Sequence, residues 1–161
     1  MIFVTVGTQK FQFNRMLSKI DELISKKVIT EKVICQSGYS TYNPKNYKSF
    51  NFLDSKEYKN YINSSNLLIT HAGVGTILEA KKDNIPVIVI PRMKKYGEHV
   101  DDHQIQIARD FDKKGLVLKC ENLNDLSLVL RQVKSKQLKN YKSNNCNFVN
   151  QLEKILESNN S

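Results

Sequence analysis

Short apolar runs alternate with segments of helical spacing along the whole chain. Six runs are predicted as strands, at residues 2–6, 33–35, 50–53, 67–70, 87–90 and 116–118. Between them, apolar residues recur every three or four positions, which predicts helices at 14–25, from Ser55 as N-cap through Ile62, and at 75–83, 101–112 and 126–133. Strands separated by helices are typical of βαβ units, so we expect an α/β fold with an open parallel sheet. The uninterrupted run at 87–90 predicts a strand that helices cover on both faces.

We expect a single domain over residues 1–161. The sequence shows no internal repeat and no boundary in composition, and its length is that of one domain. A last apolar stripe of Leu152, Ile155 and Leu156 predicts a C-terminal helix over 140–157. That helix either packs on its own sheet or docks onto a partner. No stretch approaches the roughly 18 apolar residues of a membrane-spanning helix.

The chain is basic, with 25 Lys and Arg against 16 Asp and Glu and a formal net charge of +9. Such a charge fits nucleic acid, an anionic membrane surface or an acidic partner, and also a simple bias toward lysine. Because no basic strand carries interleaved aromatic residues, nucleic-acid binding is not expected. The cysteines, Cys35, Cys120 and Cys146, are odd in number and widely spaced. They indicate reduced thiols rather than disulfides or a zinc site.

A glycine-rich turn joins the predicted strand at 67–70 to the helix that follows it. The turn contains Gly73, Gly75 and Thr76. Free backbone N–H groups and the helix dipole at such a junction favour an anion such as phosphate, and the Thr76 hydroxyl adds a donor. The sequence is neither the dinucleotide fingerprint, since Leu78 occupies the place of its third glycine, nor a P-loop. The alternative is that these are ordinary turn glycines.

Other polar residues are predicted at the same edge of the sheet. Glu79 lies one helical turn after Gly75, where a carboxylate either binds ribose hydroxyls or is an ordinary surface group. The loop at 91–104 is dense in polar and charged side chains, and the loop at 7–9 follows the first strand. Since all three loops leave carboxyl ends of predicted parallel strands, we expect them to converge on one ligand. His99 and His103 share a helical spacing but lack a third ligand, so no metal site is expected.

Three motifs, taken together, resemble the glycosyltransferase family 28 C-terminal domain. They are the opening Val4 to Gln9, the segment His71 to Glu79, and the run Asp102-His103-Gln104 that follows Pro91-Arg92. The likeness covers roughly residues 1–135. In its short length the chain is similar to the small catalytic subunits of two-subunit transferases. These include bacterial capsular and exopolysaccharide β-glycosyltransferases and the eukaryotic subunit that adds the second N-acetylglucosamine to a dolichol-linked sugar.

The resemblance implies a Rossmann-like domain with helices on both faces, equivalent to the C-terminal, donor-binding half of a GT-B glycosyltransferase. It implies that Gly73, Gly75 and Thr76 hold the donor diphosphate, with Gly7, Thr8 and His71 close by. Glu79 would bind the ribose. His103 and Gln104 would contact the donor sugar, although His103 is also compatible with a buried, hydrogen-bonded position. No cofactor and no metal are implied; the UDP-sugar is a substrate.

The implied reaction is inverting transfer from a UDP-sugar to a lipid-diphosphate-linked sugar in capsule or exopolysaccharide synthesis. Galactose, N-acetylglucosamine and glucuronic acid all remain open as the sugar. The resemblance places the acceptor site on a separate membrane-anchored subunit, which would hold this cytoplasmic chain at the inner face of the membrane. The general base is not identified, and Glu98, His99 and Asp101 are the local candidates. The alternative is a non-catalytic nucleotide-binding regulatory module.

Overall fold

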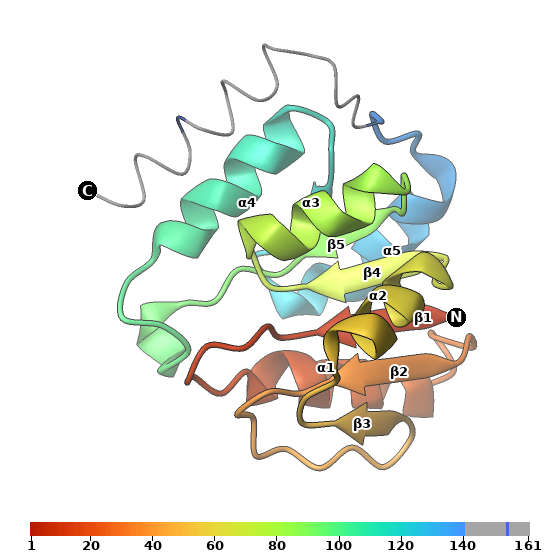
Figure 1. The fold of residues 1–161 in the computed structure, drawn as a ribbon, viewed down its shortest axis with the longest axis vertical. Coiled ribbons are helices and arrows are strands. Elements are labelled where there is room, and N and C mark those ends of the chain that lie inside the picture. Colours follow the sequence, from red (N-terminus) through yellow and green to blue (C-terminus); the bar gives the residue numbers. More distant parts are fainter. Residues whose placement is uncertain (141–153, 155–161) are drawn as a thin grey trace.

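The computed structural model describes residues 1–140 and Lys154, which form a six-stranded parallel sheet flanked by helices (Figure 1). The strands are β1 (Ile2–Thr5), β2 (Val33–Gln36), β3 (Lys48–Phe50), β4 (Leu67–Thr70), β5 (Val87–Val89) and β6 (Leu118–Lys119). The α-helices are α1 (Asn14–Ser25), α2 (Ser55–Asn63), α3 (Val74–Lys82), α4 (His103–Lys113) and α5 (Leu126–Ser135). Two short 3-10 helices are η1 (Lys94–Tyr96) and η2 (Leu123–Asp125). The predicted α/β fold is therefore confirmed.

The strand order β3-β2-β1-β4-β5-β6 determines where a ligand can bind. From β1 the chain builds outward through β2 to β3, then returns to the other side of β1 and builds outward again through β4, β5 and β6. β1 and β4 are thus neighbours at the topological switch point, where the helices that follow them, α1 and α3, lie on opposite faces of the sheet. Open α/β sheets bind ligands in the crevice at such a point.

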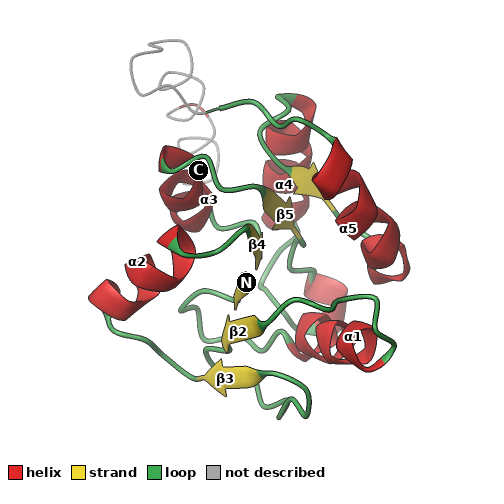
Figure 2. Cartoon of the chain, turned by 90° about the vertical axis from the view of Figure 1, so that its right-hand side faces the viewer, coloured by secondary structure: helices red, strands yellow, loops and turns green. Residues whose placement is uncertain are grey.

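Helices cover both faces of the sheet because its strands are apolar on both faces (Figures 1 and 2). One hydrophobic cluster joins Ile2 and Val4 of β1 to α1 and α5. The other joins Phe3, the residue between them, to α2, α3 and α4. This alternation follows from the two-residue period of a strand. Each fully buried Ile, Leu or Phe contributes about 1.5–3 kcal/mol, so the two clusters hold the strand ends rigidly in place.

Several predicted element boundaries are wrong, and side-chain hydrogen bonds account for two of them. The third strand ends at Phe50 rather than at 53, because the Gln36 side chain accepts the Leu53 N–H at 2.9 Å and turns the backbone away from the ladder. Asp54, not Ser55, caps α2, and its carboxylate accepts the Glu57 N–H at 2.8 Å. α4 begins at His103 rather than at 101.

The sixth strand is Leu118–Lys119, shifted toward the C-terminus from the predicted 116–118. The predicted C-terminal helix over 140–157 lies outside the described residues, except for Asn140 and Lys154. Within the part of the chain that the structure describes, no helix is long and apolar enough to cross a membrane.

The buried carboxylate of Asp21 on α1 organises the loop between β2 and β3. It accepts hydrogen bonds from the Tyr42 hydroxyl, from the backbone N–H groups of Lys45 and Asn46, and from the Asn46 side chain, all between 2.8 and 2.9 Å. Burial by itself raises the pKa of Asp21, and these hydrogen bonds outweigh it, so that the pKa lies below its ordinary value.

We expect Asp21→Ala to lower the free energy of unfolding by about 3 kcal/mol, because the hydrogen-bond donors of the loop lose a buried, charged acceptor. Since the folded-state pKa of Asp21 is depressed, its contribution is present above the unfolded pKa, near 3.9, and is lost as the pH falls through the folded value. Urea unfolding at pH 7 and at pH 3 measures both effects. Asp83→Ala, at an exposed site, is the control, and an equal loss in the two variants would contradict the assignment.

Candidate functional site

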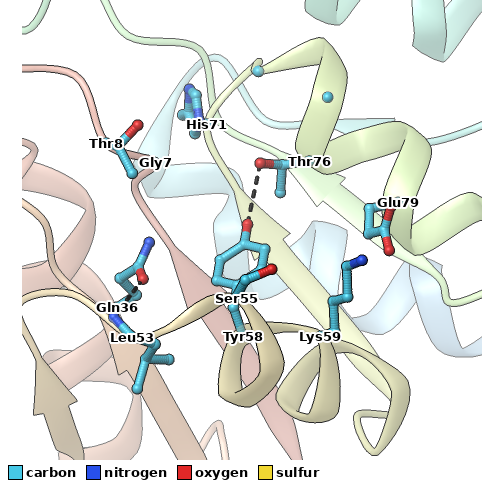
Figure 3. Close-up of a pocket in the computed structure, with 12 residues that line it drawn as sticks. Gly7, Thr8, Gln36, Leu53, Ser55, Tyr58, Lys59, His71, Thr76 and Glu79 are labelled. Atoms are coloured by element: carbon cyan, nitrogen blue, oxygen red, sulfur yellow. Dashed lines mark hydrogen bonds between the residues drawn. The ribbon is translucent and has the colours of Figure 1, made fainter.

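A pocket of about 600 Å³ opens at the switch point, beside the carboxyl ends of β1 and β4 (Figure 3). This volume is in the range of small-molecule sites. Its lining residues come from the loops after β1 and β4, from the ends of β2 and β3, and from α2 and α3. They are Gly7, Thr8, Gln36, Leu53, Ser55, Tyr58, Lys59, His71, Gly73, Gly75, Thr76 and Glu79. The loops at 7–9 and 71–76 thus converge as the strand order predicts.

The N-terminus of α3 supplies backbone donors to this pocket. Gly73 caps the helix without a side-chain hydrogen bond, and the first turn contains no acidic residue. The first backbone bond of the helix runs from the Ile77 N–H to the Gly73 carbonyl. The N–H groups of Val74, Gly75 and Thr76 precede it and have no intrahelical partner. An ideal Cβ at Gly75 would meet open space, so a ligand can approach the backbone closely there. The geometry suits an anion.

The His71 ring lies between two of the lining glycines. A Cβ built at Gly7 would come within 2.5 Å of His71 Nε2, and a Cβ at Gly73 would overlap the same ring. Gly7 also has φ of +77°, a conformation that side chains other than glycine rarely adopt. Both positions therefore require glycine for packing as well as for access to a ligand.

His71 is 6% exposed, and its ring is uncharged at neutral pH. Burial is the largest cause of a pKa lowered to about 3, and the nearby Arg92 guanidinium lowers it further. The ring is hydrogen-bonded at Nδ1, 3.2 Å from Gln104 Nε2. His71 can accordingly offer a neutral hydrogen-bonding group to the pocket, and it is a poor proton acceptor.

Tyr58 of α2 fixes the orientation of Thr76. The two hydroxyl oxygens are 3.1 Å apart, as the dashed line in Figure 3 marks. The Tyr58 ring packs edge to face on Phe3 of β1, with ring centroids 5.6 Å apart. Burial raises the pKa of Tyr58, so its hydroxyl stays protonated at neutral pH. Tyr58 thus connects the hydrophobic core at β1 to the first turn of α3.

Glu79 and Lys59 lie at the outer wall of the pocket (Figure 3). The Glu79 side chain is 29% exposed, and its carboxylate pairs with Lys82 at 3.1 Å, one turn along α3. One carboxylate oxygen carries that pair, which leaves the other able to accept hydroxyl groups. Lys59 comes from the opposite helix, α2, and brings a positive charge to the same wall.

The predicted site did not include the wall formed by Gln36, Leu53, Ser55, Tyr58 and Lys59. Gln36 is the last residue of β2, and the other four follow β3, on the far side of β1 from the glycine-rich turn. Polar residues after two further strands were the available signal. Their relation to α3 depends on the strand order, which the local patterns do not contain.

The loop at 91–104 does not line the pocket but supports it from behind. Glu98 is fully buried, where both of its carboxylate oxygens pair with Arg15, at 2.7 and 3.0 Å, and one accepts the Met93 N–H. Gln104 is 5% exposed. Its Oε1 accepts the N–H groups of Ala72, at 3.2 Å, and Arg92, at 3.0 Å. This geometry favours structural and positioning roles for the two residues.

His99, Asp101 and His103 form a separate cluster outside the pocket. Asp101 Oδ1 is 3.0 Å from His99 Nδ1 and accepts the His103 N–H at 3.0 Å. His103 Nε2 is 3.7 Å from the other Asp101 oxygen, and its side chain is 56% exposed. Among the residues that the structure describes, no group of three His, Cys, Asp or Glu side chains is placed to hold a metal ion.

Of the nine predicted donor-site residues, seven line the pocket, namely Gly7, Thr8, His71, Gly73, Gly75, Thr76 and Glu79. His103 and Gln104 do not, nor do the candidate bases Glu98, His99 and Asp101. The roles of all these residues stay predictions.

Substitutions at two lining glycines should have opposite effects on stability. Gly7→Ala places a Cβ at positive φ, which costs about 1–2 kcal/mol, and drives it into the His71 ring. Gly75→Ala meets open space within a helix and should raise stability by up to about 1 kcal/mol. Urea unfolding of the two variants in the absence of ligand measures the difference. Equal destabilisation would show that the loop is packed differently.

Known proteins resemble this chain in sequence. The chain is 29% identical over 134 residues to the mouse UDP-N-acetylglucosamine transferase subunit ALG13, covering 73% of this chain and 10% of ALG13. It is 29% identical over 154 residues to the Clostridium tetani UDP-N-acetylglucosamine--N-acetylmuramyl-(pentapeptide) pyrophosphoryl-undecaprenol N-acetylglucosamine transferase, covering 89% of this chain and 41% of that enzyme. The chain thus spans less than half the length of these relatives.

Two solved structures have the same fold. An NMR structure of ALG13 superposes with a TM-score of 0.62 at 22% identity, covering 94% of this chain and 93% of that one. MurG of Acinetobacter baumannii superposes with a TM-score of 0.56 at 18% identity, covering 82% of this chain and 41% of MurG. The sheet is that of the Rossmann-like C-terminal domain of GT-B glycosyltransferases. Since the model of the glycosyltransferase family 28 C-terminal domain also matches residues 1–158, the chain belongs to that family.

Proposed function

We propose that this chain is the donor-binding half of a UDP-sugar glycosyltransferase. The observation that carries the proposal is the set of hydrogen-bond donors at the topological switch point. The N–H groups of Gly75 and Thr76 at the start of α3 and the buried His71 ring border one pocket, with the Glu79 carboxylate one helical turn away. Neutral N–H donors suit a diphosphate, and a carboxylate suits the ribose beside it.

The names of the relatives support a finer proposal about the substrates. ALG13 is a subunit of a UDP-N-acetylglucosamine transferase, and the Clostridium enzyme transfers N-acetylglucosamine to a pyrophosphoryl-undecaprenol acceptor. We therefore favour UDP-N-acetylglucosamine as donor over UDP-galactose or UDP-glucuronic acid. The acceptor would be a sugar linked to a polyprenyl diphosphate, and capsule or exopolysaccharide assembly is the setting that fits such an acceptor.

We propose that a second protein binds the acceptor. The chain covers 41% of the Clostridium relative, whose name includes the acceptor. The acceptor half would be a membrane-anchored subunit that holds this chain at the inner face of the membrane. The net charge of +9 would favour an anionic membrane surface and a diphosphate acceptor.

The same geometry bears on the chemistry of transfer. Inverting transfer needs donors that stabilise the departing diphosphate and a base that takes the acceptor proton. The α3 N-terminus can supply the donors. His71, with a pKa of about 3, is poorly matched to the base, and Glu79 is already paired with Lys82. Glu98, His99 and Asp101 lie outside the pocket. We propose that the partner subunit supplies the base.

The alternative function is a regulatory module that binds a nucleotide without transferring a sugar. It predicts the same nucleotide binding but no product when the candidate partner, UDP-N-acetylglucosamine and a polyprenyl-diphosphate sugar are combined. Product formation that depends on this chain supports the transferase. Nucleotide binding without product in the complete mixture supports the module.

UDP should raise the melting temperature of the purified chain, whereas GDP, ADP and dTDP should not. Ligand at about 100 times its Kd adds about 2.7 kcal/mol, or roughly 5–10 °C for a domain of this size. Differential scanning fluorimetry with the four nucleotides measures the shift. An equal shift with all four would contradict a uridine-specific donor site. No shift, either alone or with the partner co-purified, would contradict nucleotide binding altogether.

Glu79→Gln should weaken UDP binding about tenfold to a hundredfold, because the ribose hydroxyls lose a charged acceptor worth about 1.5–3 kcal/mol. The wild-type chain should also bind UDP more tightly than 2′-deoxy-UDP, and the variant should not distinguish them. Isothermal titration calorimetry measures both. Glu22→Gln is the matched control, since Glu22 also pairs with lysines along its own helix but lies outside the pocket. Unchanged ribose preference in Glu79→Gln would remove Glu79 from the site.

A further inference from the structure

We infer that Gln104 is a positioning residue that fixes the protonation of the His71 ring, leaving Nε2–H as a donor toward the pocket. The inference rests on the proposed function only for the identity of the ligand. It differs from the direct contact with the donor sugar that the family resemblance implies for Gln104. Gln104 belongs to α4, whereas its partner His71 lies in the loop that follows β4.

The orientation of the Gln104 amide follows from its two backbone contacts. Oε1 lies 3.2 Å from the Ala72 N and 3.0 Å from the Arg92 N, both of which carry donor hydrogens. The reversed amide would bring its own N–H₂ group against those two donors. The oxygen therefore has to face the backbone, and Nε2 has to face His71.

The protonation of His71 follows in turn. Gln104 Nε2 is a donor, and it lies 3.2 Å from His71 Nδ1, so Nδ1 has to be the acceptor. A neutral imidazole carries one proton, and with Nδ1 unprotonated that proton resides on Nε2. Burial and the neighbouring Arg92 disfavour a second proton. The ring thus has one fixed hydrogen-bonding pattern.

The uncovered edge of the ring faces the space that a ligand would fill. A Cβ at Gly7 would come within 2.5 Å of Nε2, and one at Gly73 would overlap the ring, so the two glycines leave that edge free. Within residues 1–140, Nε2 makes no protein hydrogen bond. His71 is nevertheless 6% exposed. A donor at the pocket wall without a protein partner, beside the N–H groups of Gly75 and Thr76, is suited to a phosphate oxygen.

Nitrogen-15 NMR of the histidine rings tests the inference without any ligand. The chain has three histidines, and spectra of His99→Gln and His103→Gln identify the His71 signals. We expect a protonated Nε2 and an unprotonated Nδ1 in the wild type, unchanged between pH 5 and pH 8. A protonated Nδ1, or both tautomers in similar amounts, would overturn the inference. Because no nucleotide is present, failure of UDP binding cannot produce either result.

Gln104→Glu adds a sharper test. Its carboxylate can still accept the two backbone N–H groups but cannot donate to His71, so Nδ1 should become protonated, as a neutral ring or as an imidazolium. Gln106→Glu, the same change at an exposed site on α4, should leave the His71 pattern unchanged. A Gln104→Glu spectrum with Nδ1 still unprotonated would overturn the inference. If this variant fails to fold, the wild-type spectrum decides.

Discussion

The buried guanidinium of Arg92 is the interaction on which the architecture of the site depends. It donates hydrogen bonds to the carbonyls of Val6, Phe11 and Gln12, which follow β1, and to that of Glu98, which follows β5. Burial lowers its pKa to about 10, so it remains charged at neutral pH. A charge taken out of water needs hydrogen-bond partners. The two terminal nitrogens of Arg92 find them in these carbonyls, whereas its Nε has no partner among the described residues. The loops after β1 and β5 therefore place their carbonyl groups around this one side chain.

A chain of positioning contacts runs from that guanidinium to the pocket. The Glu98 carboxylate stabilises the Arg92 charge and holds Arg15 of α1. The Arg92 backbone N–H is bonded to Gln104, and Gln104 in turn bonds to His71. Residues of the 91–104 loop thus act on the ligand site through other residues. This explains how a loop that resembles part of a donor site can be essential to its geometry without lining the pocket.

The sequence predicts the fold well because its signals are local. Apolar runs and apolar helical stripes indicate directly which residues are buried. The glycine-rich turn from Gly73 to Thr76 indicates a helix N-terminus that is open to a ligand. Predicted element boundaries are wrong where a side chain distant in sequence hydrogen-bonds to a backbone group, as the Gln36 side chain does with the Leu53 N–H. The wall from α2 was missed for the same reason. Tyr58 meets Thr76 only because β1 brings α2 and α3 onto one face of the sheet, and no spacing along the chain encodes that contact.

The hydrogen-bond donors of this pocket are mostly uncharged, and uncharged donors suit the proposed chemistry. Unpaired N–H groups of α3 and a neutral His71 carry partial charges that do not depend on pH near neutrality. Fixed dipoles need no reorganisation when negative charge develops on a departing diphosphate. Lys59, at the outer wall, is the cation among the lining residues. A site built this way would stabilise the leaving group while binding the product less tightly than a cluster of buried cations, which favours turnover over retention of UDP.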